Sequence, residues 1–384
     1  MLRYLTAGES HGRGLVAVLD GLPAGLGVSA AAINSDLARR QRGHGRGGRQ
    51  RIEHDEVEIL SGVRGGLTLG SPVTLLVRNR DWANWSSAMA AEPGPLPPPL
   101  TAPRPGHADL PGALKFSHRD IRNVLERASA RETAARVAAG AVARLLLAAF
   151  GVDVLGHVLS IGAFRARPWR GPIGSLRRLT ESSPVRCADS RAASAMIRAI
   201  DRAARLRDTI GGEVEVRAAG LPPGLGSFTQ WDARLDGRLA AAVMSVQAVK
   251  GVAIGDAFAV AAAPGSRAHD EIRWSGRRGY FRRTNRAGGV EGGMTNGEEL
   301  VIRAALKPIS TLRRPLRTVD LATHRPVRAL VERSDVCMVP AAAVVVEAAV
   351  ALELARAFGE KFGGDSLGEM RRNHRGYLKA LRGS

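Results

Sequence analysis

The feature that most constrains the fold is the alternation of short apolar segments with segments of helical spacing along the chain. Short apolar runs predict strands over residues 15–22, 57–61, 72–77, 152–163, 212–218, 253–261 and 300–305. Helical spacing, with Ser29 as the first N-cap, predicts helices over residues 30–40, 119–150, 194–207, 232–250 and 341–358. Since such a chain can turn directly from strand to strand or return through a helix, we expect antiparallel sheets with helices packed on them, an α+β fold.

The composition is that of a protein outside the membrane. No run approaches the ~20 apolar residues that a membrane span needs, and the first residues show no apolar signal region. We therefore expect a cytoplasmic protein with no membrane partner. Cys187 and Cys337 are the only cysteines and have no paired spacing, so we expect neither a disulfide framework nor a metal site.

The net charge of +20 requires anionic partners of some kind. Nucleic acid, anionic membrane and phosphorylated small molecules all fit it. Only 4% of the residues are aromatic, and no basic stripe is interleaved with Phe or Tyr, which argues against recognition of RNA or single strands by stacking. Charge alone leaves the class of anion open.

A glycine-rich motif, T-A-G-E-S-H-G-R-G at residues 6–14, carries the first candidate for catalysis. Its glycines remove side-chain bulk around Ser10 and His11, so the backbone can turn sharply and a ligand can come close. Imidazole exchanges protons near neutral pH, which suits His11 for acid–base catalysis. The alternative is a structural turn in which His11 caps a backbone carbonyl.

A basic segment follows at residues 39–51, and we expect it to form a mobile loop that folds over a phosphorylated ligand. Guanidinium groups bind phosphate through paired hydrogen bonds, and the segment carries Arg39, Arg40, Arg42, Arg46, Arg49 and Arg51. Its G-x-G-x-x-G pattern follows the charged end of a helix rather than a buried strand, which argues against a dinucleotide fingerprint. A solvated or RNA-binding loop is the alternative.

A second candidate histidine follows an irregular Pro-rich loop over residues 90–105. In R-P-G-H-A-D, residues 104–109, His107 stands in a turn and Asp109 is placed to orient neighbouring groups. A lone histidine in such a turn is usually structural. Two glycine-flanked histidines, His11 and His107, are better candidates together than either is alone.

The motif R-A-S-A-R-E-T, residues 127–133, lies inside a predicted helix. Its small residues allow close approach of a ligand, and Arg127 and Arg131 are four positions apart, so they share a helix face. The alternative is that these arginines pair with Glu126 or Glu132.

Three further motifs gather near the C-terminal end of the chain. G-G-V-E-G-G-M-T-N-G, residues 288–297, is a loop of low side-chain volume against which a planar ligand could lie. K-P-I-S-T, residues 307–311, offers a lysine, two hydroxyls and backbone N–H groups as a phosphate cradle. E-R-S-D-V-C, residues 332–337, places Asp335 just before a helix, where capping of that helix is the alternative role.

In this order the motifs resemble the chorismate synthase family. The resemblance covers about residues 2–362 and includes G-E-S-H-G, G-R-G-G-R and V-K-G-V-A-I-G-D besides the motifs above. It implies one large α+β domain over residues 1–384, with long helices sandwiched between antiparallel sheets. It also implies a homotetramer.

The resemblance further implies a reaction. This is the 1,4-anti elimination of phosphate from 5-enolpyruvylshikimate-3-phosphate, which gives chorismate and closes the shikimate pathway to the aromatic amino acids. The family needs reduced FMN although the reaction has no net redox change; NADP is associated with it, and a separate source of reduced flavin is expected. Two phosphorylated ligands and two substrate carboxylates buried together would explain the clustered arginines without nucleic acid.

Site residues follow by matching position to position. The catalytic positions match His11, His107 and Asp335. His11 is expected to protonate the departing phosphate, His107 to support the charge of reduced FMN, and Asp335 to help move the C6 proton. The FMN-binding positions match Arg127, Ala128, Ser129, Gln247, Ala248, Gly292, Lys307, Pro308, Ile309, Ser310, Thr311 and Arg333. The substrate-binding positions match Ser10, His11, Arg40, Arg46, Arg49, Ser129, Arg131 and Arg333.

The sequence departs from the family pattern in two places. His44 holds a loop position that is often tyrosine, and Ser334 and Val336 replace His and Pro in the last motif.

Two other protein classes are alternatives to the chorismate synthase family. A basic RNA- or DNA-binding protein would explain the charge but leaves His11 and His107 without roles. A flavoprotein oxidoreductase that transfers hydride would use the same FMN.

Overall fold

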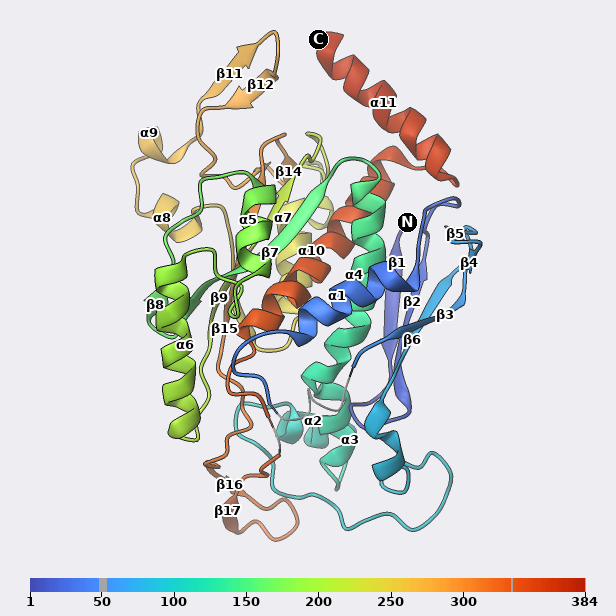
Figure 1. The fold of residues 1–384 in the computed structure, drawn as a ribbon, viewed down its shortest axis with the longest axis vertical. Coiled ribbons are helices and arrows are strands. Elements are labelled where there is room, and N and C mark those ends of the chain that lie inside the picture. The colour runs from blue at the N-terminus through green and yellow to red at the C-terminus, as the bar shows by residue number, and fades with distance from the viewer. Residues whose placement is uncertain (48–53, 333, 384) are drawn as a thin grey trace.

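The computed structural model describes residues 1–47, 54–332 and 334–383. Its long strands form two antiparallel sheets, and its long helices pack against them (Figure 1). The predicted α+β class is therefore confirmed. In the described ranges, no helix is both long and apolar enough to cross a membrane.

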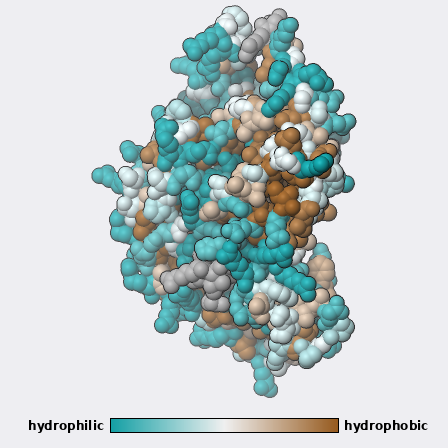
Figure 2. Space-filling view, turned by 45° about the vertical axis from the view of Figure 1, so that its right-hand side comes forward, coloured by the Kyte–Doolittle hydropathy of each residue, from teal (hydrophilic) through white to brown (hydrophobic). Residues whose placement is uncertain are grey.

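Sheet one has the strand order β1-β2-β6-β3. Its members are β1 (Arg3–Ala7), β2 (Gly14–Asp20), β6 (Val73–Arg78) and β3 (Val57–Ser61). Alternate residues of β2, namely Leu15, Ala17 and Leu19, are buried, so one face of the sheet contributes to the core. On the other face Leu5 lies opposite Val18 and is 76% exposed. Figure 2 shows apolar residues gathered on the side of the molecule where this sheet lies.

Sheet two has the strand order β10-β15-β9-β7-β8. Its members are β10 (Val249–Ile254), β15 (Leu300–Leu306), β9 (Gly212–Ala219), β7 (Asp153–Ile161) and β8 (Phe164–Arg165). From Val154 onward every residue of β7 is buried, because helices α5 (Ile173–Glu181) and α6 (Ser190–Arg205) pack on it as well as the central helices. A strand covered on both faces needs apolar residues without alternation, as this one has.

Two long helices fill the space between the sheets. Helix α4 (Thr133–Ala148) packs against β2, β6 and α10, and α10 (Val339–Phe362) packs against β7 and β9. Glycines allow these close contacts, since a Cβ at Gly140 would lie 2.4 Å from Ala348 Cβ and one at Gly156 would lie 2.1 Å from the Ala343 carbonyl oxygen. Nearly all of α10 is buried, which explains why its sequence is apolar on every side.

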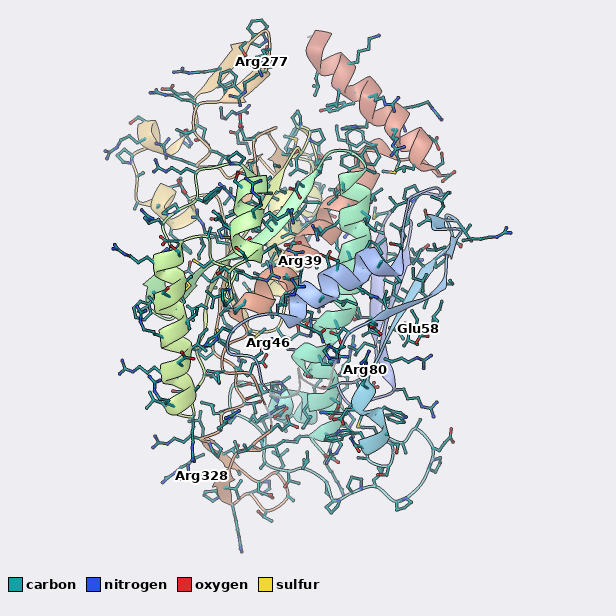
Figure 3. The ribbon with its side chains drawn as sticks, in the orientation of Figure 1. Arg39, Arg46, Glu58, Arg80, Arg277 and Arg328 are labelled. Atoms are coloured by element: carbon teal, nitrogen blue, oxygen red, sulfur yellow. The ribbon has the colours of Figure 1, made fainter. Side chains whose placement is uncertain are left out.

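Helix α1 (Ala30–Gln41) begins at the predicted cap, where the Ser29 hydroxyl accepts the N–H of Ala32. Near its C-terminal end Arg39 donates to Asp36 at 2.8 Å, to Glu181 at 2.7 Å and to Glu347 of α10 at 2.7 and 2.8 Å. Figure 3 shows Arg39 inside the body of the molecule. The expected basic loop therefore begins later than predicted, because Arg39 and Arg40 belong to the helix and are buried.

The remaining elements are short or lie at the edges of the two sheets. The helices are α2 (Asp109–Phe116), α3 (Arg122–Ala128), α7 (Leu235–Met244), α8 (Ala257–Ala261), α9 (Gly265–Ala268), α11 (Leu367–Gly383), and the 3₁₀ turns η2 (Arg80–Asn84), η3 (Ala130–Glu132) and η4 (Trp231–Ala233). The hairpins pair β4 (Val63–Arg64) with β5 (Leu67–Thr68), β11 (Ile272–Ser275) with β12 (Gly279–Arg282), β13 (Val290–Glu291) with β14 (Met294–Thr295), and β16 (Arg317–Val319) with β17 (Pro326–Arg328). Positive charge extends over these outer elements, since Arg277 and Arg328 lie at opposite ends of the molecule (Figure 3).

Three predicted elements were wrong in extent or type. The helix expected over residues 119–150 is interrupted at Ser129, whose backbone is extended and whose hydroxyl accepts the N–H of Arg131. The helix expected over residues 232–250 ends at Met244, because the chain from Val249 pairs with β15 as a strand. The strand expected over residues 253–261 is mostly wrong, since residues 257–261 form helix α8. The Pro-rich loop over residues 90–105 contains no helix or strand, as predicted.

Candidate active site

One cavity of about 640 Å³ brings together most of the residues that the motifs single out. It lies where the ends of α1, α3 and α10 meet the R-P-G-H-A-D, K-P-I-S-T and E-R-S-D-V-C loops. The predicted residues that line it are Ser10, His11, Arg40, Arg46, His107, Ala128, Ser129, Arg131, Gln247, Ala248, Lys307, Ile309, Ser310, Thr311 and Asp335. Apolar side chains of α10 and Leu125 complete the wall. All three predicted catalytic residues therefore share one cavity.

Three predicted residues that the structure describes stand apart from this lining. Arg127 donates to the carbonyls of Thr6 and Gly8, so it supports the backbone of the first motif. Gly292 forms the turn of the β13–β14 hairpin, and neither it nor Pro308 lines the cavity. Arg49 and Arg333 lie outside the described residues.

His11 is held from two directions. Its Nδ1 lies 2.8 Å from Glu126 Oε1, and its backbone N–H donates to Glu126 Oε2 at 2.7 Å. The ring stacks on Trp85 with centroids 3.8 Å apart and planes inclined by 21°. The expected alternative, a histidine that caps a backbone carbonyl, is not what the ring does here, since its Nδ1 faces a carboxylate.

His107 is held by Asp109, which stands two residues further along the R-P-G-H-A-D motif. Its Nδ1 lies 2.6 Å from Asp109 Oδ1, and Arg104 Nε donates to Asp109 Oδ2 at 2.8 Å. Burial alone would raise the pKa of Asp109, but hydrogen bonds from His107 and Arg104 hold that pKa well below its usual range. Arg104 also donates to Thr311 at 2.9 Å and Glu332 at 2.8 Å, so it ties together the three loops that carry the later motifs.

Asp335 faces the basic segment that follows α1. Its Oδ2 lies 2.6 Å from Arg46 Nη1, and its Oδ1 accepts the backbone N–H of Gly47 at 2.6 Å. The carboxylate therefore bonds to that segment, whereas the alternative was that it caps α10; the N-cap position there is Met338, without a side-chain hydrogen bond. His44, the departure from the family pattern, pairs with Asp201 of α6 at 2.7 Å.

Two arginines share one buried carboxylate at the back of the cavity. Arg40 Nη1 donates to Asp55 Oδ2 at 3.0 Å, and Arg131 Nη1 pairs with Asp55 Oδ1. Burial, with help from Arg131 and Arg46, lowers the pKa of Arg40 to about 10, although Asp55 opposes this shift. Arg40 is therefore still a cation at neutral pH, and two positive charges face one negative charge.

Further polar groups of the cavity are available to a ligand. Gln247 donates its amide nitrogen to Glu132 at 3.1 Å, which fixes the amide orientation, and its buried Oε1 has no hydrogen-bond partner in the described part of the chain. Ala248 next to it has a left-handed backbone with φ of 70°. Lys307 Nζ donates to the Gly106 carbonyl at 2.8 Å, and burial together with Lys250 lowers its pKa.

Several residues of the site carry no functional signal in the sequence. Glu126 stands beside the R-A-S-A-R-E-T motif, where the pattern indicates only a partner for nearby arginines. Arg104 opens the R-P-G-H-A-D motif, but the motif alone indicates no role for it. Trp85 and Asp55 stand outside every motif, so only the fold could bring them to His11 and to the arginine pair.

The cavity has cationic walls, two imidazoles held by carboxylates and an apolar side. These features define the active site of an enzyme for a small, multiply anionic ligand.

Comparison with known proteins agrees with this class. The chorismate synthase family profile matches residues 2–358. The chorismate synthase of Symbiobacterium thermophilum is 60% identical over 99% of both chains, and that of Geobacter sulfurreducens is 58% identical over 100% of both. A crystal structure of chorismate synthase superposes with a TM-score of 0.81 at 42% identity, over 100% of this chain and 99% of the other.

The chain therefore belongs to the chorismate synthase family of carbon–oxygen lyases, whose members carry out the last step of the shikimate pathway. The motif-based resemblance is confirmed.

Proposed function

We propose that this cavity catalyses the 1,4-anti elimination of phosphate from 5-enolpyruvylshikimate-3-phosphate to give chorismate, with reduced FMN as cofactor. The observation that carries the proposal is the meeting of His11, His107 and Asp335 with a cluster of arginines in one cavity. The substrate has one phosphate and two carboxylates, so a cavity that binds it must supply fixed cations. Arg40, Arg46 and Arg131 line this one.

His11 is the proposed acid for the leaving group. Phosphate departs more readily when it is protonated. Because Nδ1 of His11 faces Glu126, its Nε2 is the nitrogen that can face a ligand in the cavity. Ser10 and Ser129 lie beside it, with hydroxyl oxygens 3.2 Å apart, and their hydroxyls can hold the same anion. The proton and the binding groups thus come from neighbouring positions.

Asp335 is proposed to help move the proton lost from C6, and His107 is the proposed support for the anionic cofactor. In the structure Arg46 occupies one oxygen of the Asp335 carboxylate. An anionic substrate that binds Arg46 would weaken this pair and leave the carboxylate able to accept a proton. Reduced FMN, when bound, supplies an electron to the breaking C–O bond and takes it back, which leaves no net redox change.

The residues on the Gln247 side fit a flavin. An isoalloxazine ring carries an N–H donor and an apolar face. Gln247 Oε1, which has no partner among the described residues, would match the donor, and the side chains of Ala341 and Ala342 would match the apolar face. Lys307, Ser310 and Thr311 would hold its phosphate. A protein that binds only the substrate would not need this second set of polar groups.

Replacing Gln247 with leucine is expected to weaken FMN binding about 3- to 10-fold, because one buried hydrogen bond to the ligand is lost. Titration of FMN fluorescence measures the dissociation constant. Gln230→Leu is the control, because Gln230 is exposed at the start of η4 and does not line the cavity. Equal dissociation constants for Gln247→Leu and the wild type would show that FMN does not bind against Gln247.

Further features of the family are proposed for this chain. We propose that residues 1–384 form one domain in which α4 and α10 are the middle layer of a β-α-β sandwich, supported by the contacts of α4 mainly with sheet one and of α10 with sheet two. We also propose a cytoplasmic homotetramer that receives reduced flavin from a separate source. The exposed apolar side chains on the outer face of sheet one, such as Leu5, support association between copies.

An anaerobic assay tests the proposed reaction. The enzyme is incubated with 5-enolpyruvylshikimate-3-phosphate and photoreduced FMN, and chorismate and inorganic phosphate are measured together. Equal amounts of both are expected, and none with oxidised FMN alone. Phosphate released without chorismate would mean that the cavity hydrolyses the substrate instead.

A further inference from the structure

Glu126 makes an unusually complete contact with the motif that carries His11. Its backbone carbonyl accepts the N–H of Ser10 at 3.0 Å, and its carboxylate accepts the N–H of His11 at 2.7 Å. The same carboxylate faces His11 Nδ1 at 2.8 and 3.1 Å. Only 1% of the Glu126 side chain is exposed, so water cannot replace these bonds.

The two histidines of the cavity are held by carboxylates in different electrostatic settings. Asp109 divides its charge between His107 and Arg104, which donates to both of its oxygens. Glu126 has no arginine or lysine within ion-pair distance among the described residues, and its one ionisable partner is His11. A buried carboxylate without another counter-ion favours a cation on the group it touches. The cation that Glu126 can favour is the imidazolium of His11.

The ring of His11 is also fixed in orientation. Trp85 stacks on it, and the bond from Nδ1 to Glu126 prevents the ring from turning over. An imidazolium in this position carries one proton toward Glu126 and the other, on Nε2, toward a ligand. The acid proton would then lie on the nitrogen that can reach the substrate.

We propose that Glu126 is a positioning residue: its carboxylate fixes the His11 ring through Nδ1 and stabilises the imidazolium that can offer its Nε2–H to the departing phosphate. The inference rests on the proposed function, in which His11 is the acid. It adds the residue that enables His11 to act as an acid. Glu126 itself touches neither substrate nor cofactor, since it is absent from the cavity lining. Its effect is transmitted through the imidazole.

Glu126→Gln tests this assignment because it keeps the shape of the side chain and removes its charge. With substrate and reduced FMN saturating, kcat is expected to fall about 100-fold, within the range for one positioned acid, while KM changes less than about 3-fold. Glu126→Asp keeps the charge one methylene farther away and is expected to recover about a tenth of the wild-type rate or more. Glu353→Gln is the matched control, a mostly buried carboxylate of α10 that pairs with Arg238 away from the cavity.

A measurement without ligands separates positioning from mere structural support. In protein labelled with ¹⁵N-histidine, the His11 signals, assigned by their loss in His11→Ala, report which ring nitrogens carry protons. At pH 7 the fraction of doubly protonated His11 is expected to be lower in Glu126→Gln than in the wild type. The other charged groups of the cavity are present in both proteins, namely Arg40, Arg46, Arg104, Arg131, His107, Lys307, Glu332 and Asp335.

Unchanged His11 nitrogen signals in Glu126→Gln, or a wild-type kcat, would overturn the inference. A rate that falls equally in Glu126→Gln and Glu126→Asp, with unchanged signals, would show a structural role only. If His11→Ala retains the wild-type rate, the proposed function of His11 fails, whereas the ¹⁵N signals still decide whether Glu126 sets its protonation. The two failures are thus distinguishable.

Discussion

His11→Ala is expected to lower the rate of chorismate formation by roughly 10² to 10⁴, the usual range for one positioned acid or base. The methyl group of alanine cannot give a proton to the departing phosphate, and no second imidazole stands in the same place, since His107 is bound to Asp109 elsewhere in the cavity. The affinity for FMN should change little. Glu126 then keeps a buried charge without the imidazole that faces it, so some loss of stability is also expected.

Single-turnover kinetics measure this prediction most directly. Enzyme in excess of substrate, with saturating reduced FMN, reports the chemical steps without product release, and the rate is followed against pH. His118→Ala is the matched control, because His118 contacts Asn123 and Phe116 and does not line the cavity. A wild-type rate and pH profile in His11→Ala would return this histidine to the role of a structural turn.

Glu347→Gln is expected to destabilise the protein by about 3–5 kcal/mol, the usual cost of removing one partner from a buried ion pair. Only 1% of the Glu347 side chain is exposed, and it accepts from both terminal nitrogens of Arg39 and from the Gly156 N–H. Arg144 Nη1 lies 3.2 Å from the same carboxylate. The substitution leaves two mostly buried guanidinium groups with less negative charge around them, at the point where α1, α4 and α10 meet.

The same carboxylate gives a pH dependence of known sign. Burial would raise its pKa, but Arg39 and Arg144 lower the pKa of Glu347 to about 2. A carboxyl whose pKa is lower in the folded than in the unfolded protein stabilises the fold above the unfolded value, near ~4.3, and loses this contribution as the pH falls toward the folded value. The free energy of unfolding should therefore fall less between pH 5 and pH 3 in Glu347→Gln than in the wild type.

Urea denaturation at pH 7, 5 and 3 gives these free energies. Glu58→Gln is the control, because Glu58 pairs with Arg78 on the surface of sheet one, where solvent screens the charges, and little change is expected. Equal losses of stability in the two variants would show that the buried cluster contributes no more than a surface pair.

Local sequence signals predicted the elements whose structure is decided locally or by burial on all sides. Ser29 begins α1 where predicted, and residues 57–61 form β3 with the predicted bounds. The apolar run at residues 341–358 lies within α10. The break at Ser129 was not predictable in this way, because helical spacing continues through it and its extended backbone places Ser129 and Arg131 at the cavity. The apolar residues 257–261 suit a strand and a helix equally well.

The motifs predicted which residues form the site but not what holds them. Glu126 is 115 positions from His11, and Asp55 is 76 from Arg131, so no spacing rule connects either pair. Neighbouring arginines also differ in ways the sequence does not show, because Arg39 is bound to Glu347 of α10 while Arg40 lines the cavity. The sequence thus predicts the chemistry of the cavity, whereas the partners that tune it come from tertiary packing.

The central claim is that reduced flavin takes part in the reaction without being consumed. The most direct test is to count the chorismate formed per FMN in a sealed anaerobic reaction that contains enzyme, excess 5-enolpyruvylshikimate-3-phosphate, a small known amount of photoreduced FMN and no other reductant. Chorismate is expected to exceed the flavin many-fold, with phosphate in equal amount and the flavin still reduced at the end. Chorismate that stops at one per flavin, with the flavin oxidised in step, would contradict the account and identify an ordinary flavoprotein oxidoreductase.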